Sequence, residues 1–307
     1  MQVVLGSGGI IGKGLANVLP GYTDKVRLVS RNPSALNKND ELVKADLTDP
    51  GQTEKAVESA DVAYLVLGME YKLDVWQRNW PKVMTNVINA CKKFNTKLVF
   101  FDNVYLYGIV DGWMTEQTPV NPSSKKGEVR AKIAEQLINE YKQGNLNAII
   151  ARAADFNGPT KTTFLYPLVY EKIMNGKKAQ WFLNAKVKHS LTYTSDAAKA
   201  TALLGNTPEA YNRTWHLPSD KNATTGEEFI RMVEEVYGKN KGYSTLSRFM
   251  LGMVGLFVPV IREMNEMLYQ YDSEYLFDSS EFENHFFKAT SVKQSIEETI
   301  SALTQRL

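Results

Sequence analysis

Short apolar runs alternate with segments of helical spacing through the first half of the chain. Six of these runs have the length and composition of buried strands: 3–5, 26–29, 41–45, 62–67, 97–101 and 146–151. Between them lie segments such as 53–59 and 83–94, in which apolar residues recur at the period of a helix. Strands that alternate with helices form right-handed crossovers and a parallel sheet covered on both faces. The alternation therefore predicts an α/β fold with a doubly wound parallel sheet of the Rossmann type.

The alternation of strand-like and helix-like segments ends after residue 160, and apolar residues in the remainder recur mostly at helical spacing. Apolar residues recur at helical intervals over three stretches: 227–237, 261–268 and 292–303. We expect a first domain of residues 1–160, to which part of 189–217 returns, and a smaller, mostly helical domain of residues 161–307. Ligands of doubly wound sheets bind at the carboxyl ends of the strands. The second domain is therefore expected to cover such a site and to bind the substrate.

Charge and cysteine content narrow the class of protein. The 36 Lys and Arg residues nearly balance the 34 Asp and Glu residues, so no nucleic-acid partner is expected. The single Cys91 sits on the apolar side of a helical pattern, which excludes a disulfide framework and predicts a buried thiol. Because strand-like sequence begins almost at Met1, we expect no targeting segment and a cytoplasmic location.

One apolar stretch tests the expectation that the protein meets no membrane. Residues 249–261 read F-M-L-G-M-V-G-L-F-V-P-V-I and lie between Arg248 and Arg262. The run is too short to cross a bilayer and contains Pro259. It is interpreted as a helix that is either buried or facing a partner.

The first strand-like run is followed by a cluster of glycines. Residues 3–12 read V-V-L-G-S-G-G-I-I-G, so Gly6, Gly9 and Gly12 lie three residues apart. A strand, a glycine-rich turn and a helix together aim backbone amides and the helix dipole at an anion. The spacing differs from G-x-G-x-x-G, because position 11 is Ile, but its place after the first strand predicts a dinucleotide site. The expected cofactor contacts in this turn are Gly6, Ser7, Gly9, Ile10, Ile11 and Gly12.

The ends of the next strands add further cofactor candidates. An acid after the second strand binds the ribose of NAD, whereas a base accommodates the 2′-phosphate of NADP. Arg31 holds that position, so NADP is expected in preference to NAD, although Arg31 could also be an ordinary surface charge. Asp46 and Leu47 follow the third strand and are expected to flank the adenosine, and Leu67 and Gly68 end the fourth strand.

Four further motifs extend the pattern over nearly the whole chain. They are N-W-P-K-V-M-T-N-V-I-N-A-C (79–91), D-N-V-Y-L-Y-G (102–108), R-A-A-D-F-N-G-P (152–159) and L-T-Y-T-S-D-A-A-K-A (191–200). With the glycine turn, they resemble the short-chain dehydrogenase/reductase superfamily, in its extended branch of NAD(P)-dependent epimerases and dehydratases. The resemblance implies hydride exchange between a nicotinamide and a carbonyl or alcohol carbon.

The proton-transfer residues of that family are not retained. The family carries a Ser or Thr after the fifth strand and a Tyr-x-x-x-Lys further along, whose lysine charge lowers the pKa of the phenol. Here Asn103 takes the Ser/Thr position. One alignment then places Glu128 and Lys132 at the pair, and another places Gly127 and Ala131 there. Neither supplies a tyrosine.

Other polar residues in the region could replace the missing pair. The candidates near the expected site are Tyr105, Tyr107, Lys126, Arg130 and Lys132. We expect Asn103 to hydrogen-bond a substrate oxygen, and Tyr105 or Lys132 to transfer the proton. Tyr107 is assigned to the substrate. Each of these residues could instead be a packing residue or a surface charge.

A second departure concerns the substrate. Sugar-nucleotide members of the family carry Arg-x-x-Asn before Gly-Pro, but here Arg152 is followed three residues on by Asp155. A carboxylate would repel a diphosphate, so a small molecule other than a nucleotide sugar is expected, unless Asp155 only caps its loop. Asp155 and His189 are assigned to the substrate: the resemblance implies substrate contacts at the position of His189, although a hydrogen-bonded structural histidine is the favoured alternative there. The three histidines, His189, His216 and His285, lack metal-binding spacing, so no metal site is expected.

Two functions compete on these observations. The first is an NAD(P)-dependent oxidoreductase or epimerase/dehydratase-like enzyme that acts on a carbonyl or hydroxyl carbon. The second is an NADP-binding sensor or scaffold with impaired catalysis, similar to NmrA-like regulatory proteins, and the missing tyrosine favours it. By analogy with the family, residues 80–94 could also pair two copies into a homodimer.

Overall fold

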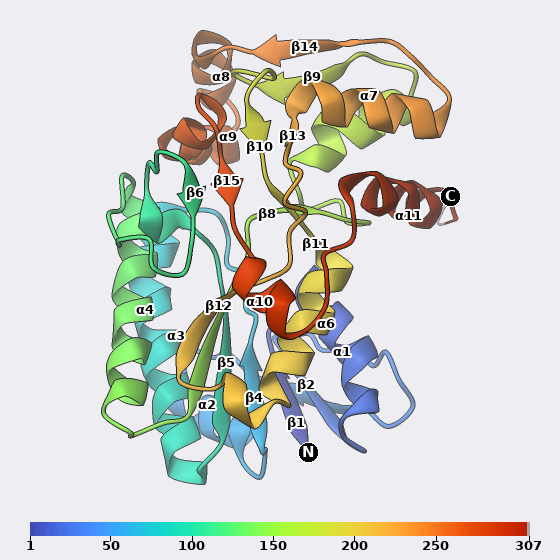
Figure 1. Ribbon diagram of the computed structural model, residues 1–307. Coiled ribbons are helices and arrows are strands. Elements are labelled where there is room, and N and C mark those ends of the chain that lie inside the picture. The colour runs from blue at the N-terminus through green and yellow to red at the C-terminus, as the bar shows by residue number, and fades with distance from the viewer. Residues whose placement is uncertain (306–307) are drawn as a thin grey trace. The chain divides into compact units, whose positions relative to one another are not determined.

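The computed structural model describes residues 1–305, which form two compact units (Figure 1). The first unit comprises the segments Met1–Leu106, Lys125–Ala153 and Ser195–Leu217. The second comprises Tyr107–Ser124, Ala154–Thr194 and the chain from Pro218 onward. The division differs from the boundary expected at residue 160, because Trp113–Met114 and Asp155–Asn157 pair with strands of the second unit.

The first unit is built on a sheet of seven parallel strands. In chain order these are β1 (Gln2–Leu5), β2 (Val26–Ser30), β3 (Glu41–Lys44), β4 (Val62–Leu65), β5 (Lys97–Asp102), β7 (Ala148–Arg152) and β12 (Arg213–His216). Their order across the sheet is β12-β7-β5-β4-β1-β2-β3, and every pairing is parallel. Strands β2 and β3 are added on one side of β1, and the later strands, from β4 to β12, are added on its other side. The predicted doubly wound parallel sheet is confirmed.

Burial explains why the strands could be recognised. All residues of β1, β4 and β7 are buried, as expected of strands covered on both faces, whereas the edge strand β3 alternates between half-buried and exposed residues. The seventh strand, β12, reads R-T-W-H and has no apolar run. It was therefore expected only as part of a segment that returns to the first domain.

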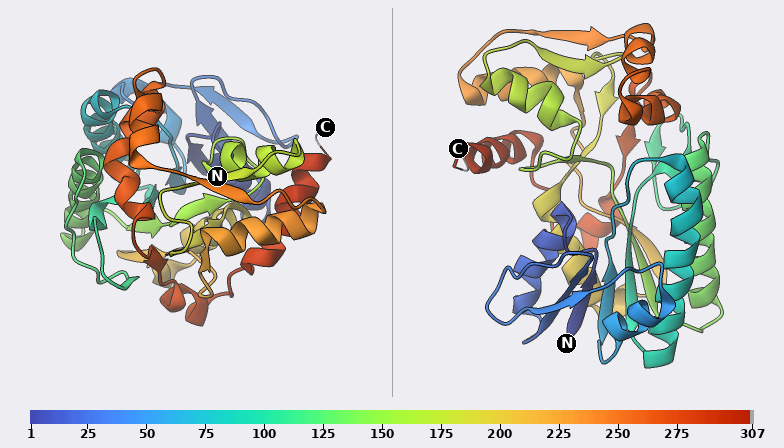
Figure 2. Two further views of the ribbon diagram at one scale, coloured as in Figure 1. Left: turned by 90° about the horizontal axis from the view of Figure 1, so that it is seen from above. Right: turned by 180° about the vertical axis from the view of Figure 1, so that it is seen from behind.

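Five helices cover the two faces of this sheet. They are α1 (Ile10–Val18), α2 (Pro50–Val57), α3 (Leu73–Phe94), α4 (Lys125–Lys142) and α6 (Thr194–Gly205). Helices α2, α3 and α4 lie on one face, and α1 and α6 on the other (Figures 1 and 2). The approach of α1 to α6 is close, because a Cβ on Gly14 would lie 2.6 Å from Cβ of Ala198.

Helix α3 is longer than its sequence pattern indicated. The sequence indicates helical spacing over 83–94 and, by resemblance, from residue 80, but α3 begins at Leu73 and continues through Pro81, a residue that usually ends or kinks a helix. The extra turns bury Trp76 and Trp80 in the core beneath the helix. Cys91 is also buried on α3, as predicted, and burial raises the pKa of its thiol.

The second unit combines four two-stranded ribbons with short helices. The ribbons pair β6 (Trp113–Met114) with β15 (Leu276–Phe277), β8 (Asp155–Asn157) with β11 (Leu191–Tyr193), β9 (Ala179–Phe182) with β14 (Tyr243–Leu246), and β10 (Lys188–His189) with β13 (Thr224–Thr225). The helices are α5 (Glu171–Met174), α7 (Gly226–Tyr237), α8 (Arg248–Gly255), α9 (Pro259–Met264), α10 (Ser280–His285) and α11 (Val292–Thr304). Trp181 of β9 and Phe229 of α7 are central to the core of this unit.

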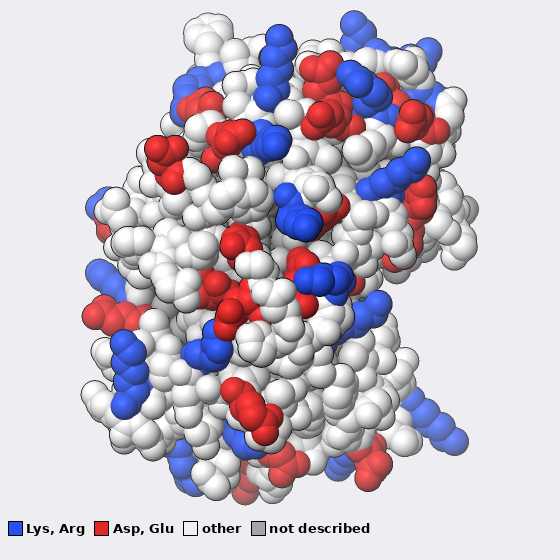
Figure 3. Space-filling view, in the orientation of Figure 1, with Lys and Arg blue, Asp and Glu red and all other residues white. Residues whose placement is uncertain are grey.

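Two searches of the described residues concern membranes and metals. Within residues 1–305, no helix combines the length and the hydropathy needed to cross a bilayer. The same residues contain no group of three or more His, Cys, Asp or Glu side chains placed to hold a metal ion. Basic and acidic side chains are interspersed on the face shown in Figure 3.

Candidate functional site

The turn between β1 and α1 requires glycine at two of its three spaced positions. Gly6 has a φ of 106°, and a Cβ there would lie 2.6 Å from the Cα of Leu67. A Cβ on Gly12 would lie 2.6 Å from the carbonyl oxygen of Gly6 and 2.7 Å from the Cα of Ser7. Gly9 is less constrained, since its nearest neighbour would lie at 3.9 Å. The turn is therefore tight where its backbone meets β4 and α1.

Helix α1 begins at this turn without a side-chain cap. Its N-cap is Gly9, no side chain accepts a hydrogen bond from its first turn, and that turn contains no acidic residue. Both Gly8 and Gly9 are exposed, and a Cβ on Gly8 would meet nothing within 4 Å. The amides at the start of α1 and the positive end of its dipole therefore fit an anionic group such as a pyrophosphate. On these observations the residues present fit a dinucleotide.

The side chains of the turn mainly contact other parts of the protein. The Ser7 hydroxyl donates to the Val29 carbonyl oxygen at 3.2 Å, and the amides of Gly6 and Ser7 donate to the same oxygen. Ile11 is buried, and Ile10 is half-buried. Any contact of Ser7 and Ile11 with a cofactor would therefore be made mainly through the backbone.

Arg31 and Asp46 lie near each other beyond β2 and β3. Both are exposed. Hydrogen bonds from the backbone and hydroxyl of Thr48 lower the pKa of the Asp46 carboxyl, and the charge of Arg31 lowers it further. Ser30, at the end of β2, has a buried hydroxyl with no hydrogen-bond partner among residues 1–305. A basic and a polar side chain thus occupy the position that distinguishes the two dinucleotides.

The two leucines assigned to the cofactor differ in placement. Leu47 is 5 % exposed and packs in the core, and its carbonyl oxygen accepts hydrogen bonds from Thr53 and Asn86. Its side chain therefore packs inward, and its place beside the adenosine stays a prediction. Leu67 is half-buried at the end of β4, and Gly68 beside it is exposed with open space around its Cα.

A buried ion-pair network lies at the carboxyl end of β5. Asp102 accepts hydrogen bonds from Nε of Arg130 on α4 at 2.8 Å and from Nη2 of Arg152 on β7 at 3.0 Å. The carboxylate is fully buried, and each arginine side chain is 4 % exposed. Removing one member of such a network leaves a buried charge unpaired, so the network fixes β5, β7 and α4 relative to one another.

The residues after β5 form a turn that presents Tyr105. The Asn103 side-chain oxygen accepts a hydrogen bond from the amide of Tyr105 at 3.1 Å. The Tyr105 hydroxyl lies 3.4 Å from that of Tyr71, and its ring stacks on Trp76 at 6.2 Å between centroids. Both phenols are half-buried. Asn103 therefore shapes the turn, and Tyr105 stands beside a second phenol that the sequence did not indicate.

The buried face of α4 carries a basic pair in a register that neither alignment considered. Lys126 is 1 % exposed and Arg130 is 3 % exposed, four residues apart, whereas Lys132 is exposed. The Lys126 ammonium lies 4.7 Å from the centre of the Tyr71 ring. The assignment of Lys132 to proton transfer is therefore wrong, because it lies on the solvent side of α4. The apolar residues 129, 133, 134 and 137 mark the inner face and could have identified this register.

Within the second unit, Asp155 and His189 are brought into contact. Asp155 Oδ2 lies 3.0 Å from His189 Nε2 and accepts a hydrogen bond from the Tyr271 hydroxyl at 2.9 Å. The imidazole is sandwiched between the rings of Tyr271 and Tyr275, at 4.9 and 4.4 Å. His189 is 2 % exposed, and its Nδ1 has no hydrogen-bond partner among the described residues. Asp155 therefore bonds to side chains and does not merely cap its loop.

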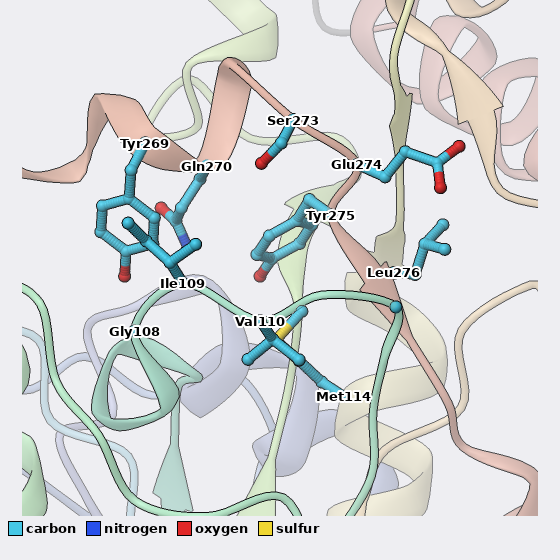
Figure 4. Close-up of a pocket in the computed structure, with 11 residues that line it drawn as sticks. Gly108, Ile109, Val110, Met114, Tyr269, Gln270, Ser273, Glu274, Tyr275 and Leu276 are labelled. Atoms are coloured by element: carbon cyan, nitrogen blue, oxygen red, sulfur yellow. The ribbon is translucent and has the colours of Figure 1, made fainter.

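Tyr107, the third residue assigned to the substrate, is buried in the second unit. The following residues, 108–110, line a pocket together with Tyr269 and Tyr275 (Figure 4). Its cavity of about 20 Å³ has room for little more than a water molecule. A larger cavity of about 630 Å³ in the same unit is lined by Trp113 and by polar residues of 220–222 and 278–288. The position of Tyr107 does not indicate a substrate contact.

Comparison with known families identifies the chain. Residues 2–216 match the model of the NAD dependent epimerase/dehydratase family. The chain belongs to this family. The match covers the glycine turn, the network at Asp102 and the returning strand β12. A search of curated proteins finds no match.

Solved structures of epimerases and dehydratases share the fold over the full length. A UDP-N-acetylglucosamine 4-epimerase from Methanobrevibacter ruminantium superposes with a TM-score of 0.81 at 18 % identity, over 100 % of this chain and 98 % of that chain. A UDP-glucuronic acid 4-epimerase from Bacillus cereus, bound to NAD, gives 0.80 at 16 % identity, with 100 % and 99 % covered. A dTDP-glucose 4,6-dehydratase from Bacillus anthracis, also with NAD, gives 0.81 at 16 % identity, with 99 % and 96 % covered.

Proposed function

We propose that this chain is an NAD(P)-dependent oxidoreductase or epimerase/dehydratase-like enzyme that acts on a carbonyl or hydroxyl carbon of a small molecule. The observation that carries the proposal is the start of α1, where Gly6 and Gly12 permit a tight turn and no side chain caps the helix. Membership of the NAD-dependent epimerase/dehydratase family supports it. Bound NAD(P) would supply or accept a hydride at the substrate carbon.

The cofactor proposed is NADP in preference to NAD. Arg31 is an exposed guanidinium at the position that faces the ribose in related sites, and a guanidinium is well shaped for a phosphate. The crystal structures from Bacillus cereus and Bacillus anthracis contain NAD, so NAD is the alternative cofactor to be tested. The Arg31→Asp variant tests the choice, because equal preference before and after the change would contradict the assignment.

Tyr105 is proposed as the proton-transferring residue. A hydroxyl that loses a hydride from its carbon must also release a proton, which a phenolate can accept. The Tyr71 hydroxyl at 3.4 Å and the Lys126 charge at 4.7 Å from the Tyr71 ring would both stabilise such a phenolate. Asp102 and Arg130 would position α4, and Asn103 would position Tyr105, without touching the substrate.

The substrate is proposed to be a small molecule without a nucleotide diphosphate. Asp155 presents a carboxylate where sugar-nucleotide members carry an asparagine amide, and its bonds to His189 and Tyr271 hold it in place. Because the structurally similar proteins include enzymes named for UDP- and dTDP-sugars, those sugars belong in the test panel. Turnover of a UDP-sugar or dTDP-sugar would contradict this part of the proposal.

The first experiment is a titration of the purified protein with NADPH and NADH, followed through quenching of its tryptophan fluorescence. Selective binding of NADPH supports the cofactor assignment, whereas failure to bind either dinucleotide contradicts the enzyme proposal. A panel of aldehydes, ketones and alcohols then measures turnover. Tyr105→Phe should lower turnover about a hundredfold with little change in cofactor affinity. Lys126→Met should lower turnover, whereas the matched variant Lys132→Met, on the exposed face of the same helix, should not.

A second candidate function rests on one specific observation. The buried residues of α4 include Lys126 and Arg130 but no tyrosine. A protein that binds NADP without turning over any substrate would have the same cofactor turn and could serve as a sensor. Binding of NADPH together with no turnover across the panel, in wild type and Tyr105→Phe alike, would favour this candidate.

A further inference from the structure

Helices α8 and α9 and their connection expose an unusual amount of apolar surface. Between residues 247 and 260, only Leu251 and Gly255 are buried. Phe249, Leu256 and Phe257 are 78 %, 69 % and 82 % exposed. The other exposed apolar side chains of this segment are Met250, Met253, Val254, Val258 and Val260. We refer to residues 247–260 as the apolar hairpin. Of the two interpretations of this stretch, burial is therefore wrong, and a surface that faces a partner stays a prediction.

The apolar hairpin is hydrophobic on both of its sides. Its inner side packs through Leu251 on a small core that includes Phe182 and Tyr271. A surface helix normally turns polar residues toward water, and one that is apolar all round is normally covered. A contiguous exposed apolar patch on a globular unit marks a site of association. We therefore expect the outer side of the hairpin to bind a partner.

The charged residues of the hairpin and of the strand before it indicate what kind of partner binds there. The stretch 236–262 contains four basic residues, Lys239, Lys241, Arg248 and Arg262, and no Asp or Glu. Strand β14 leads into the hairpin at its carboxyl end and pairs in parallel with β9, so the exposed lysines at 177 and 178 lie with Lys241 at the other end of this ribbon. Arg248 forms an ion pair with Asp272, and the acids Glu263 and Glu266 follow Arg262 in the chain. The surface is therefore apolar at the hairpin and basic at the far end of the ribbon.

We propose that the apolar hairpin docks on an anionic lipid bilayer. Short amphipathic segments that combine exposed Phe and Leu with flanking Lys and Arg bind in the interface of such membranes, without spanning them. Anionic headgroups attract the basic residues, while the aromatic and aliphatic side chains enter the boundary with the acyl chains. This inference goes beyond the proposed enzymatic function and departs from the expectation that the protein meets no membrane.

A second copy of the chain is a poorer occupant of this surface. A two-fold interface places the same patch of each subunit against the other, so an interface that covered the ribbon as well as the hairpin would set its lysines against like charges. No acid within 236–262 could pair with them. The exposed residues 256–260 also follow one another through the turn between α8 and α9, so they are uncovered on several sides. A fluid bilayer can surround such a turn, whereas a flat protein surface covers only one side.

The proposal is tested by flotation of the full-length protein with vesicles of phosphatidylcholine alone and with vesicles of equal parts phosphatidylcholine and phosphatidylglycerol. Wild type should bind the mixed vesicles at low ionic strength and bind them less as salt is added. The double variant Phe249→Ser/Phe257→Ser should bind at least about tenfold more weakly, because it lacks two aromatic side chains that would enter the bilayer. Arg262→Glu should weaken binding to the mixed vesicles as well.

Leu42→Ser is the matched control, because Leu42 is an exposed leucine on β3, in the first unit. Its vesicle binding should equal that of wild type. NADPH titration and circular dichroism of each variant show whether it is folded, so failure of the cofactor proposal and failure of this one are distinguishable. No binding to mixed vesicles, equal binding to both kinds, or binding unchanged in the double variant would overturn the proposal. A dimer that the double variant dissociates, without vesicle binding, would assign the surface to a second copy.

Discussion

Two helices, α1 in the first unit and α7 in the second, begin in opposite ways. The start of α7 is completed by its own side chains: Thr225 and Glu228 form a reciprocal capping box, and Glu227 adds a second acid in the first turn. The start of α1 has Gly9 as its N-cap, with no side-chain hydrogen bond and no acid. Both helices carry the same positive dipole end.

The difference shows which helix end is built for stability and which is left for a ligand. A capping box contributes about 1 kcal/mol to a helix by satisfying amides that otherwise lack partners. At α1 these amides are left to water or to an anion, a loss of stability that is useful where a phosphate binds. Exchanging features between the two helix ends tests this assignment of roles.

The largest effect is expected from Gly12→Ala. Its Cβ would lie 2.6 Å from the carbonyl oxygen of Gly6 and 2.7 Å from the Cα of Ser7, which are backbone atoms that cannot move without opening the turn. We expect the free energy of unfolding to fall by about 2–3 kcal/mol. Affinity for NADPH should fall by about a hundredfold or more, since the amides at the start of α1 would be displaced. Urea unfolding and fluorescence titration measure the two quantities.

Gly8→Ala is the matched control for this prediction. A Cβ on Gly8 would meet nothing within 4 Å, although it lies in the same turn. Stability and affinity should both remain close to wild type. Equal losses in the two variants would mean that any side chain in the turn is harmful and that the clash at Gly12 is not the cause.

The next effect tests the open start of α1 directly, through Gly9→Asp. The backbone of Gly9 has φ −77° and ψ 170°, and a Cβ there would meet its nearest neighbour only at 3.9 Å, so an aspartate is accommodated. The new carboxylate should cap α1 and raise the free energy of unfolding by a few tenths of a kcal/mol. It should also repel the cofactor phosphates and lower NADPH affinity by about thirtyfold.

Opposite signs for stability and affinity are the decisive feature of Gly9→Asp. Gly9→Asn is its control, because it offers a similar cap without the negative charge and should retain more affinity. An affinity that is unchanged in Gly9→Asp would show that no anion binds at the start of α1, and the comparison with α7 would lose its functional meaning.

The same contrast explains how much of the molecule could be predicted from sequence. Strands β1, β4 and β5 were recognisable because burial on both faces requires continuous apolar runs. The glycine turn was recognisable because Gly6 and Gly12 are required by the backbone itself. Constraints of this kind act within a few residues of the chain, so a short stretch of sequence is enough to recognise them.

Side-chain networks were less predictable because they join distant segments. The contact of Asp102 with Arg130 and Arg152 spans 28 and 50 residues, and that of Asp155 with Tyr271 spans 116. Alignment on the loop after β5 gave Lys132, whereas the burial pattern of α4 selects Lys126. Asp155 and His189 were both assigned to the substrate from the resemblance, but their mutual contact needed the pairing of β8 with β11 and the neighbouring β10.

A smaller effect is expected at α7, from Thr225→Ala. The Thr225 hydroxyl accepts a hydrogen bond from the amide of Glu228, and its loss should lower the free energy of unfolding by about 1 kcal/mol. NADPH affinity should be unchanged, because the cap belongs to the second unit and to no part of the glycine turn. Thr225→Ser, which keeps the hydroxyl, is the control. A change in affinity with Thr225→Ala would contradict the division of roles between the two helix ends.

The smallest effect is the pH dependence of the same cap. Hydrogen bonds from the backbone and side chain of Thr225 lower the pKa of the Glu228 carboxyl from its ordinary value of 4.5. A carboxyl whose pKa is lowered by folding contributes stability above its unfolded pKa and loses it as the pH falls through the folded value. Wild type should therefore exceed Glu228→Gln in stability at neutral pH, by a few tenths of a kcal/mol because the side chain is exposed, and the difference should shrink as the pH falls through the lowered pKa of the carboxyl. Urea unfolding of both proteins across this pH range measures it. A difference that persists in acid would mean that the side chain stabilises α7 by packing, and that its charge at this helix end contributes nothing.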